Sequence, residues 1–157
     1  MNTDDLFLAR AVALAQQASV SGDGGPFGAV IVREGKVLAE GWNQVVANGD
    51  PTAHAEISAI RSACAALGSF HLTGSTLYTS SEPCPMCLSA AYWGRISRIV
   101  FANSRAEAAS IGFCDDDLYL ELNRPYPERR IIMDHHPMPD ALVPWQHWAN
   151  NPNRTVY

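Results

Sequence analysis

The sequence predicts one layered α/β domain, and three observations carry that prediction. Segments in which apolar residues recur at helical spacing alternate along the chain with short runs that are typical of strands. The chain has 157 residues, enough for one domain with a core of its own. Apolar residues make up 47% and charged residues 17%, an ordinary globular balance. We therefore expect residues 1–157 to form a single domain without disulfide bonds.

The first half of the chain predicts a helix, a hairpin and a second helix. Apolar residues recur at helical spacing from residue 4 to about residue 19, and a Gly-rich and Pro-containing loop follows. Residues 27–32 and 37–46 then predict two strands around a tight turn. Asp50 as N-cap, with Pro51 at the first helical position, predicts a helix that runs to Leu67.

The second half of the chain continues the alternation of strands and helices. The predicted elements are, in order, a strand at 76–79, a helix at 86–92, a strand at 99–102, a helix at 118–122, a strand at 130–133 and a helix at 139–149. Helices between strands favour crossover connections, so a layered sheet is expected.

Three side chains are candidate zinc ligands. Cys84 and Cys87 form a CxxC motif where a loop becomes a helix, and the helix N-terminus favours thiolates. His54 and Glu56 lie two residues apart at the start of another predicted helix, so they can converge only near the helix end. A hydrolytic zinc site needs three protein ligands and one open position. We expect His54, Cys84 and Cys87 to bind one Zn²⁺ per chain and Glu56 to act as acid–base catalyst.

Other interpretations of the cysteines remain open at this point. A redox CxxC pair would leave the histidine and the glutamate without a role. A structural zinc site needs a fourth ligand, and the candidates are Cys64, Cys114, His135 and His136. Cys64 lies at helical spacing from Ile57 and Ile60, so a buried thiol is the favoured interpretation there.

The two motifs together point to one chemistry. His54-Ala55-Glu56 followed by Pro83-Cys84-Pro85-Met86-Cys87 reproduces the HxE and PCxxC signature of zinc nucleobase deaminases. In such a site zinc activates a water molecule, and the glutamate carries protons to the ring and to the departing ammonia.

The sequence resembles the cytidine-deaminase-like superfamily, and within it most the small bacterial guanine deaminases. The stretches that carry the resemblance are 24–30, 41–43, 50–56, 77–87 and Tyr157. The resemblance implies a three-layer α/β/α sandwich with a central five-stranded mixed sheet. It also implies a homodimer in which the C-terminal tail, residues 150–157, is swapped and places Tyr157 in the partner's site.

The resemblance further implies a set of substrate contacts. The expected purine-binding residues are Phe27, Asn43, Ala55, Trp93, Asp115 and Tyr157. Because Asp115 has two acidic neighbours, Asp116 is the alternative contact. An acidic side chain suits guanine, whose ring N–H and amino groups donate hydrogen bonds. Guanine is therefore the expected substrate; guanosine and an amino-triazine of the ammeline type remain alternatives.

Charge and hydropathy restrict the partners. The formal charge is −5, and no basic cluster is visible along the chain, so we expect no nucleic-acid partner. This disfavours a tRNA adenosine deaminase, which shares both motifs. A non-catalytic zinc-binding module is disfavoured by Glu56. No apolar run is long enough to cross a bilayer, and the first residues are unlike a secretory signal, so we expect no membrane partner and a cytoplasmic location.

Overall fold

The computed structural model describes residues 2–157, and the contacts of the chain divide it into two compact units. The first unit ends at Tyr119, and the second unit is Leu120–Tyr157. None of the helices in the described part of the chain has the length and the apolar composition that a bilayer crossing requires.

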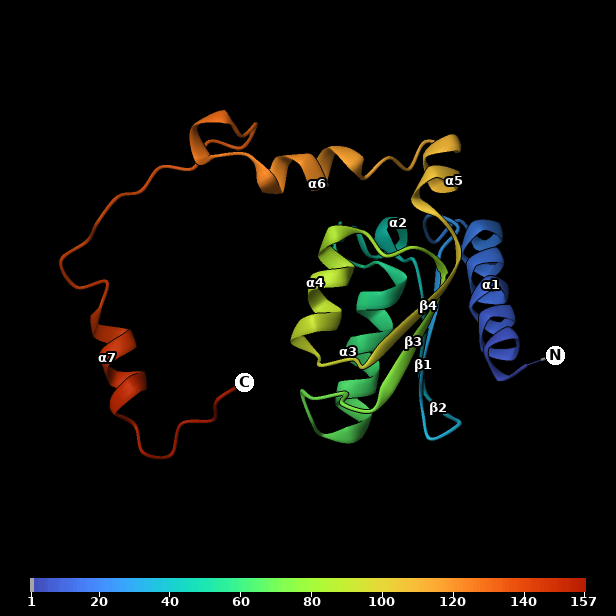
Figure 1. The fold of residues 1–157 in the computed structure, drawn as a ribbon, viewed down its shortest axis with the longest axis horizontal. Coiled ribbons are helices and arrows are strands. Elements are labelled where there is room, and N and C mark those ends of the chain that lie inside the picture. The colour runs from blue at the N-terminus through green and yellow to red at the C-terminus, as the bar shows by residue number, and fades with distance from the viewer. Residues whose placement is uncertain (1) are drawn as a thin grey trace. The chain divides into compact units, whose positions relative to one another are not determined.

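A four-stranded mixed sheet forms the centre of the first unit (Figure 1). Its strands are β1 (Gly28–Arg33), β2 (Lys36–Trp42), β3 (Ser75–Ser81) and β4 (Arg98–Asn103), in the spatial order β2-β1-β3-β4. Strand β1 pairs antiparallel with β2 and with β3, whereas β3 and β4 are parallel. Because β3 and β4 are parallel, their carboxyl ends lie at the same end of the sheet.

Helices cover both faces of this sheet, which confirms the predicted α/β/α layering (Figure 1). Helix α1 (Thr3–Ser21) contacts one face, and α3 (Ala55–Leu67) contacts the other face and α4 (Pro85–Trp93). The remaining helices of the chain are α2 (Val45–Asn48), α5 (Arg105–Ser110), α6 (Asp116–Asn123), the 3-10 helix η1 (Tyr126–Glu128) and α7 (Val143–Asn150).

Strand β1 supplies a core to each face of the sheet because its side chains alternate. Ala29 and Ile31 pack against α3 in a buried cluster that includes Ala59 and Leu77. Val30 and Val32 point to the opposite face and pack in a second cluster, together with Phe7, Ala11, Leu14 and Tyr78. Burial on both faces explains why β1 reads as an uninterrupted apolar run.

The predicted fifth strand is absent from the described residues. Residues 130–133 were expected to form it, but the chain there is irregular, and Ile131 and Ile132 are exposed. A strand needs a neighbour to pair its N–H and C=O groups, and the Leu120–Tyr157 unit contains no strand. An apolar run alone therefore did not suffice to predict a strand.

Two predicted boundaries near the site were also wrong. Strand β2 ends at Trp42 because the buried Asn43 side chain accepts a hydrogen bond from Val45 N, which begins the short helix α2. Helix α3 begins after His54 and not at Pro51, because the Asp50 carboxylate accepts hydrogen bonds from the N–H and the hydroxyl of Thr52. Such an Asx turn competes with the helix.

Gly41 lets β2 approach the first turn of α3 closely. A Cβ atom at Gly41 would lie 2.4 Å from the carbonyl oxygen of Ala55 and 2.6 Å from Ala59 N. Both are backbone atoms, so any larger residue would displace the start of α3. The glycine thus fixes the helix end that carries His54 and Glu56.

Asp4 links α1 to the edge of the sheet, and the stabilisation that it supplies should disappear in acid. Its carboxylate accepts hydrogen bonds from Arg98 and Tyr78, and the bond with Arg98 does most to lower the pKa of Asp4 to about 2. Because this pKa is below the unfolded value, Asp4 stabilises the fold fully above about pH 4 and loses this effect as the pH falls through about 2. We expect Asp4→Asn to lower the urea midpoint near neutral pH, with the difference from wild type shrinking below about pH 4. A difference that is the same at every pH would contradict this assignment.

Candidate active site

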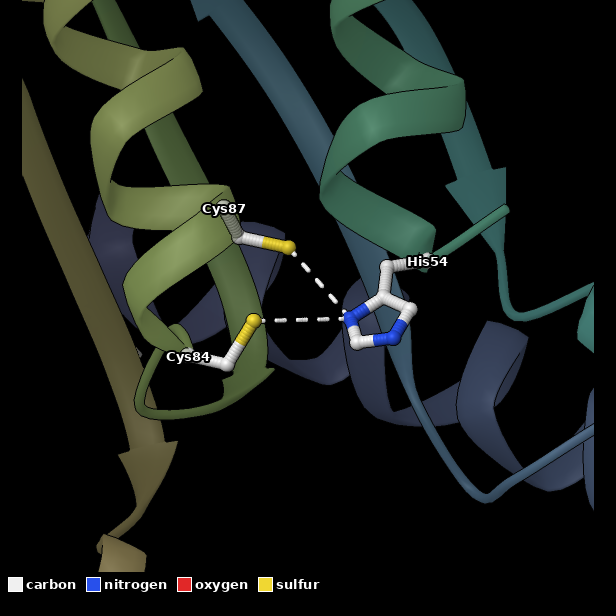
Figure 2. A group of neighbouring side chains, drawn as sticks. All are labelled: His54, Cys84 and Cys87. Carbon is white, nitrogen blue, oxygen red and sulfur yellow. Dashed lines mark hydrogen bonds between the residues drawn. The ribbon is translucent and has the colours of Figure 1, made fainter. Parts of the chain in front are cut away.

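His54, Cys84 and Cys87 come together at the N-terminal ends of two helices (Figure 2). His54 is the N-cap of α3, and Cys84 is the N-cap of α4, with Cys87 in the first turn of α4. The Nδ1 atom of His54 lies 3.6 Å from Cys84 Sγ and 3.5 Å from Cys87 Sγ. The ligand atoms of all three side chains lie within 4.8 Å of one another.

This geometry fits a tetrahedral zinc ion. Zn–S bonds of about 2.3 Å and Zn–N bonds of about 2.05 Å at a tetrahedral angle put sulfur and nitrogen about 3.6 Å apart. The two observed nitrogen–sulfur distances, 3.5 and 3.6 Å, match that separation. The geometry also assigns Nδ1, and not Nε2, as the histidine ligand atom.

The two thiols respond differently to this environment. Hydrogen bonds from the Cys87 thiol and from His54 lower the pKa of Cys84 to about 4. The hydrogen bond to Cys84, together with burial, raises the pKa of Cys87 far above its usual value. Without a cation the pair therefore holds one negative charge, and a second thiolate is opposed. A zinc ion supplies the positive charge that stabilises both thiolates, so binding it releases a proton.

No fourth protein ligand joins this group among the described residues. The group of His, Cys, Asp and Glu side chains close enough to share an ion consists of His54, Cys84 and Cys87. Cys64 and Cys114, considered above as further ligands, are not in it. Three protein ligands leave one coordination position for a water molecule, as catalytic zinc sites require.

Glu56 is buried beside the ligands without being one of them. It is the second residue of α3 and only 6% exposed. Cys87 Sγ lies 3.4 Å from its Oε2 atom, and the Thr79 hydroxyl lies 3.5 Å from Oε1. Burial raises the pKa of Glu56. A carboxylate with a raised pKa accepts and returns protons more readily near neutral pH, which suits a general acid–base catalyst.

A cavity of about 310 Å³ opens onto this group of side chains. His54, Glu56 and Cys84 line it on the side of the metal ligands. Phe27 and Phe113 form an apolar wall, with their ring centroids 4.8 Å apart in an edge-to-face contact. The volume is at the lower end of the range for small-molecule pockets, about 300 to 1,000 Å³. A single flat heterocycle is therefore the kind of ligand that the cavity suits.

The family follows from comparison with known proteins. The family model described as the cytidine and deoxycytidylate deaminase zinc-binding region matches residues 1–103, about two thirds of the chain. This chain belongs to that family. The match contains both motifs that supply the three ligands and Glu56. Zinc is thus the metal of this deaminase domain.

Several individual relatives are similar over different shares of the chain. A guanine deaminase of Bacillus subtilis is 47% identical over 153 residues, which are 98% of both chains. An X-ray structure of guanine deaminase from that species superposes with a TM-score of 0.96, at 47% identity, and covers 100% of this chain and 99% of that one. A tRNA-specific adenosine deaminase of Haemophilus influenzae is 40% identical over 118 residues, 72% of this chain and 68% of the relative. A guanine deaminase structure from Nitrosomonas europaea has a TM-score of 0.65 at 32% identity and covers 70% of this chain and 64% of that chain.

In the structure of this deaminase, some of the predicted substrate contacts line the cavity and others do not. Phe27 and Asp115 line the cavity, whereas Asp116 does not and forms an ion pair with Arg105 at 3.5 Å. Asn43 is buried, and its side-chain oxygen accepts hydrogen bonds from Gly25 N and Val45 N. These bonds do not use the Asn43 NH₂ group, and Asn43 is not among the residues that line the cavity.

The three other predicted contacts do not line this cavity either. Ala55 is fully buried in the first turn of α3, where it packs in the core. Trp93, at the end of α4, is 70% exposed. Tyr157 lies in the Leu120–Tyr157 unit and is 71% exposed.

Several residues of the cavity wall were not predicted from the sequence, Phe113 and Glu82 among them. Phe113 contributes a ring, and a Cβ atom at Gly25 would lie 2.9 Å from Phe27 and 3.0 Å from Phe113, so glycine is required there. Glu82 lines the cavity next to the PCxxC motif. Its position directly before Pro83 was the available signal, but a lone glutamate in a loop is more often a solvated residue.

Proposed function

We propose that this chain catalyses the hydrolysis of guanine to xanthine and ammonia. The observation that carries this proposal is a buried Glu56 beside three zinc ligands with one open position, at the base of a cavity the size of one heterocycle. The likeness to the Bacillus subtilis guanine deaminase along 98% of the chain supports guanine as the base.

The side chains of the site have two roles, metal binding and proton transfer. His54, Cys84 and Cys87 hold the zinc, which supplies the Lewis acidity that activates a water molecule near neutral pH. Glu56 accepts a proton from this water at a carboxylate oxygen. As the water oxygen bonds to C2 of guanine, Glu56 passes this proton to ring N3. It then accepts the remaining proton of the new C2 hydroxyl group and delivers it to the amino nitrogen. The C2–N bond then breaks, and ammonia and xanthine leave.

Guanine offers donors and acceptors that match the cavity. Asp115 accepts from the ring N–H or the amino group, and the Asn43 NH₂ group donates to an acceptor of the purine. Phe27 and Phe113 pack against the flat ring system. A base without these donors would leave the Asp115 carboxylate unpaired, which is costly in a partly buried position. The small volume favours the free base over guanosine.

A substrate panel tests the proposal. Ammonia release by the zinc-loaded protein is measured with guanine, guanosine, adenine, cytosine, an ammeline-type amino-triazine and a tRNA anticodon stem-loop. We expect kcat/KM for guanine to exceed that for cytosine by at least ~100-fold, because the polar contacts would be unmatched. A higher kcat/KM for guanosine or the triazine would move the assignment to that compound. Activity confined to the stem-loop would overturn it.

We also propose that the active molecule is a homodimer with a swapped C-terminal segment. No residue of the Leu120–Tyr157 unit is buried. Glu121 and Arg129 are partly buried, and the other residues of the unit are exposed. Large apolar side chains are exposed in it, among them Ile131, Ile132, Met138, Trp145, Val156 and Tyr157. Such exposure marks a surface that another chain covers. A second copy is the partner that a closed twofold dimer provides.

Mixed dimers test the swap directly. Glu56→Gln removes the acid–base group, and Tyr157→Ala removes the tail residue that we place in the partner's site. If the tail is swapped, a heterodimer of these two variants has one site with both residues intact. We expect its guanine deamination to recover to about half of the wild-type rate, one intact site of two. Recovery no greater than the sum of the parent variants would contradict the swap.

A reducing cytoplasm is the compartment that we propose for this protein. All four cysteines are free thiols in the structure, and thiolate zinc ligands require reduced sulfur.

A further inference from the structure

The cavity wall that carries Asp115 is a short irregular segment between two helices. Residues 111–115 join α5 to α6 and contain Phe113, Cys114 and Asp115, all of which line the cavity. Gly112 takes a φ of +96° in this segment, a conformation that other residues rarely adopt. The N–H groups of residues 111–113 donate to carbonyl oxygens of α5, and the Asp115 carbonyl oxygen accepts from N–H groups of α6. The position of the segment therefore depends on what holds these two helices.

Arg105 meets both flanks of the segment and the loop that carries Cys84. Its Nε lies 3.2 Å from Glu82 Oε1, and its backbone N–H donates to Glu82 Oε2 over 3.0 Å. Its NH1 lies 3.5 Å from Asp116 Oδ1, and its guanidinium carbon lies 4.4 Å from the Tyr119 ring centroid. Tyr119 in turn donates its hydroxyl proton to the carbonyl oxygen of Pro83 over 3.3 Å.

We propose that Arg105 is a positioning residue that fixes Asp115 relative to the metal-binding loop. Arg105 begins α5, Asp116 begins α6, and Glu82 and Pro83 immediately precede Cys84. The guanidinium of Arg105 therefore connects α6 to the carboxylate of Glu82, two residues before the zinc ligand Cys84, while Arg105 itself begins the helix that precedes the Asp115 segment. The catalytic consequence rests on the proposed function, because Asp115 is assigned there to the purine.

Arginine suits this task better than lysine does. A planar guanidinium binds a carboxylate with several N–H groups and stacks on an aromatic ring at the same time. The Arg105 side chain is 36% exposed and that of Asp116 is 65% exposed, so each ion pair alone is partly screened. Because one guanidinium makes all of these contacts, they form a network. Losing this network would shift Asp115, and a small misplacement of a substrate-binding group can cost about 100-fold in rate.

Hydrogen exchange of the zinc-loaded protein tests the positioning role without any substrate. Leu118 N and Tyr119 N donate to the carbonyl oxygen of Asp115, so amides in peptides covering 111–119 report on the segment. We expect Arg105→Met to speed exchange in these peptides about 10-fold, with Arg105→Lys intermediate and β1 peptides unchanged. Arg10→Met is the matched control, because Arg10 pairs bidentately with Glu40 outside the cavity lining. Unchanged exchange in Arg105→Met, or the same change in Arg10→Met, would overturn the inference.

A double-mutant cycle on guanine then tests the link to Asp115. We expect Arg105→Met to lower kcat/KM by about 10- to 100-fold at unchanged zinc content, and Arg105→Lys to restore part of it. If Arg105 acts through Asp115, Arg105→Met added to Asp115→Asn should cost less than about 3-fold further. Additive losses would overturn that link. If the wild type deaminated no purine, the proposed function would fail, while hydrogen exchange would still decide the role of Arg105.

Discussion

Glu56→Gln is expected to lower guanine turnover by about 10²- to 10⁴-fold while one zinc per chain remains bound. The amide has the shape of the carboxylate but can neither accept nor return a proton. Glu56 is not among the three side chains grouped for metal binding, so its loss leaves the ligand set intact. Single-turnover rates and zinc content by atomic emission measure the two effects separately.

Glu40→Gln is the matched control for this variant. Glu40 pairs with Arg10 and does not line the cavity, so the same substitution there should leave turnover unchanged. Wild-type rates in Glu56→Gln would show that another group moves the protons. Loss of zinc in Glu56→Gln would show that Glu56 is needed to keep the metal.

The second large effect is expected from Cys84→Ala, which should lose zinc and activity together. The remaining His54 and Cys87 cannot complete a three-ligand site, and binding energy lost at a metal site is also folding energy. We therefore expect a clearly lower Tm as well as metal-free protein. Zinc content and thermal unfolding of the purified variant provide the measurement.

Cys64→Ala separates this effect from the loss of a cysteine as such. Cys64 is partly buried against the α3 core cluster and is not in the ligand group. Its substitution should cost about 1 kcal/mol of stability and leave zinc and turnover intact. Full zinc occupancy in Cys84→Ala would rule out Cys84 as a ligand.

The layered α/β fold was predictable because its elements carry strong local signals. The helical spacing that begins at Phe7 and the apolar run 29–32 predict α1 and β1, and each buries its side chains as the spacing requires. The three ligands were predictable for another reason. Two helix N-termini bring His54 next to Cys84 and Cys87, and each helix start is visible in the sequence within a few residues.

Other features depend on contacts that no local pattern records. The turn at Asp50 delays α3, since its carboxylate bonds to Thr52 more favourably than a helix start would. Residues 130–133 look like a strand, yet pairing requires a neighbour that their own unit does not supply. The role of Arg105 was invisible because its partners, Glu82 and Tyr119, lie 23 and 14 residues away along the chain.

The substrate contacts were the part of the site that was hardest to predict from the sequence. Asp115 and Asp116 are chemically identical in the sequence, and only the fold turns one toward the cavity and the other toward Arg105. Asn43 could be singled out, but the use of its oxygen by two backbone N–H groups becomes visible only in three dimensions.

Zinc titration of the metal-free protein tests the central claim most directly. Chelator-treated protein is reloaded with zinc in small steps, and the conversion of guanine to xanthine is followed by ultraviolet absorbance. Three ligands at one site predict that activity is absent without zinc, rises linearly and stops rising at one zinc per chain. Full activity in the zinc-free protein, or no xanthine from the fully loaded one, would contradict this account.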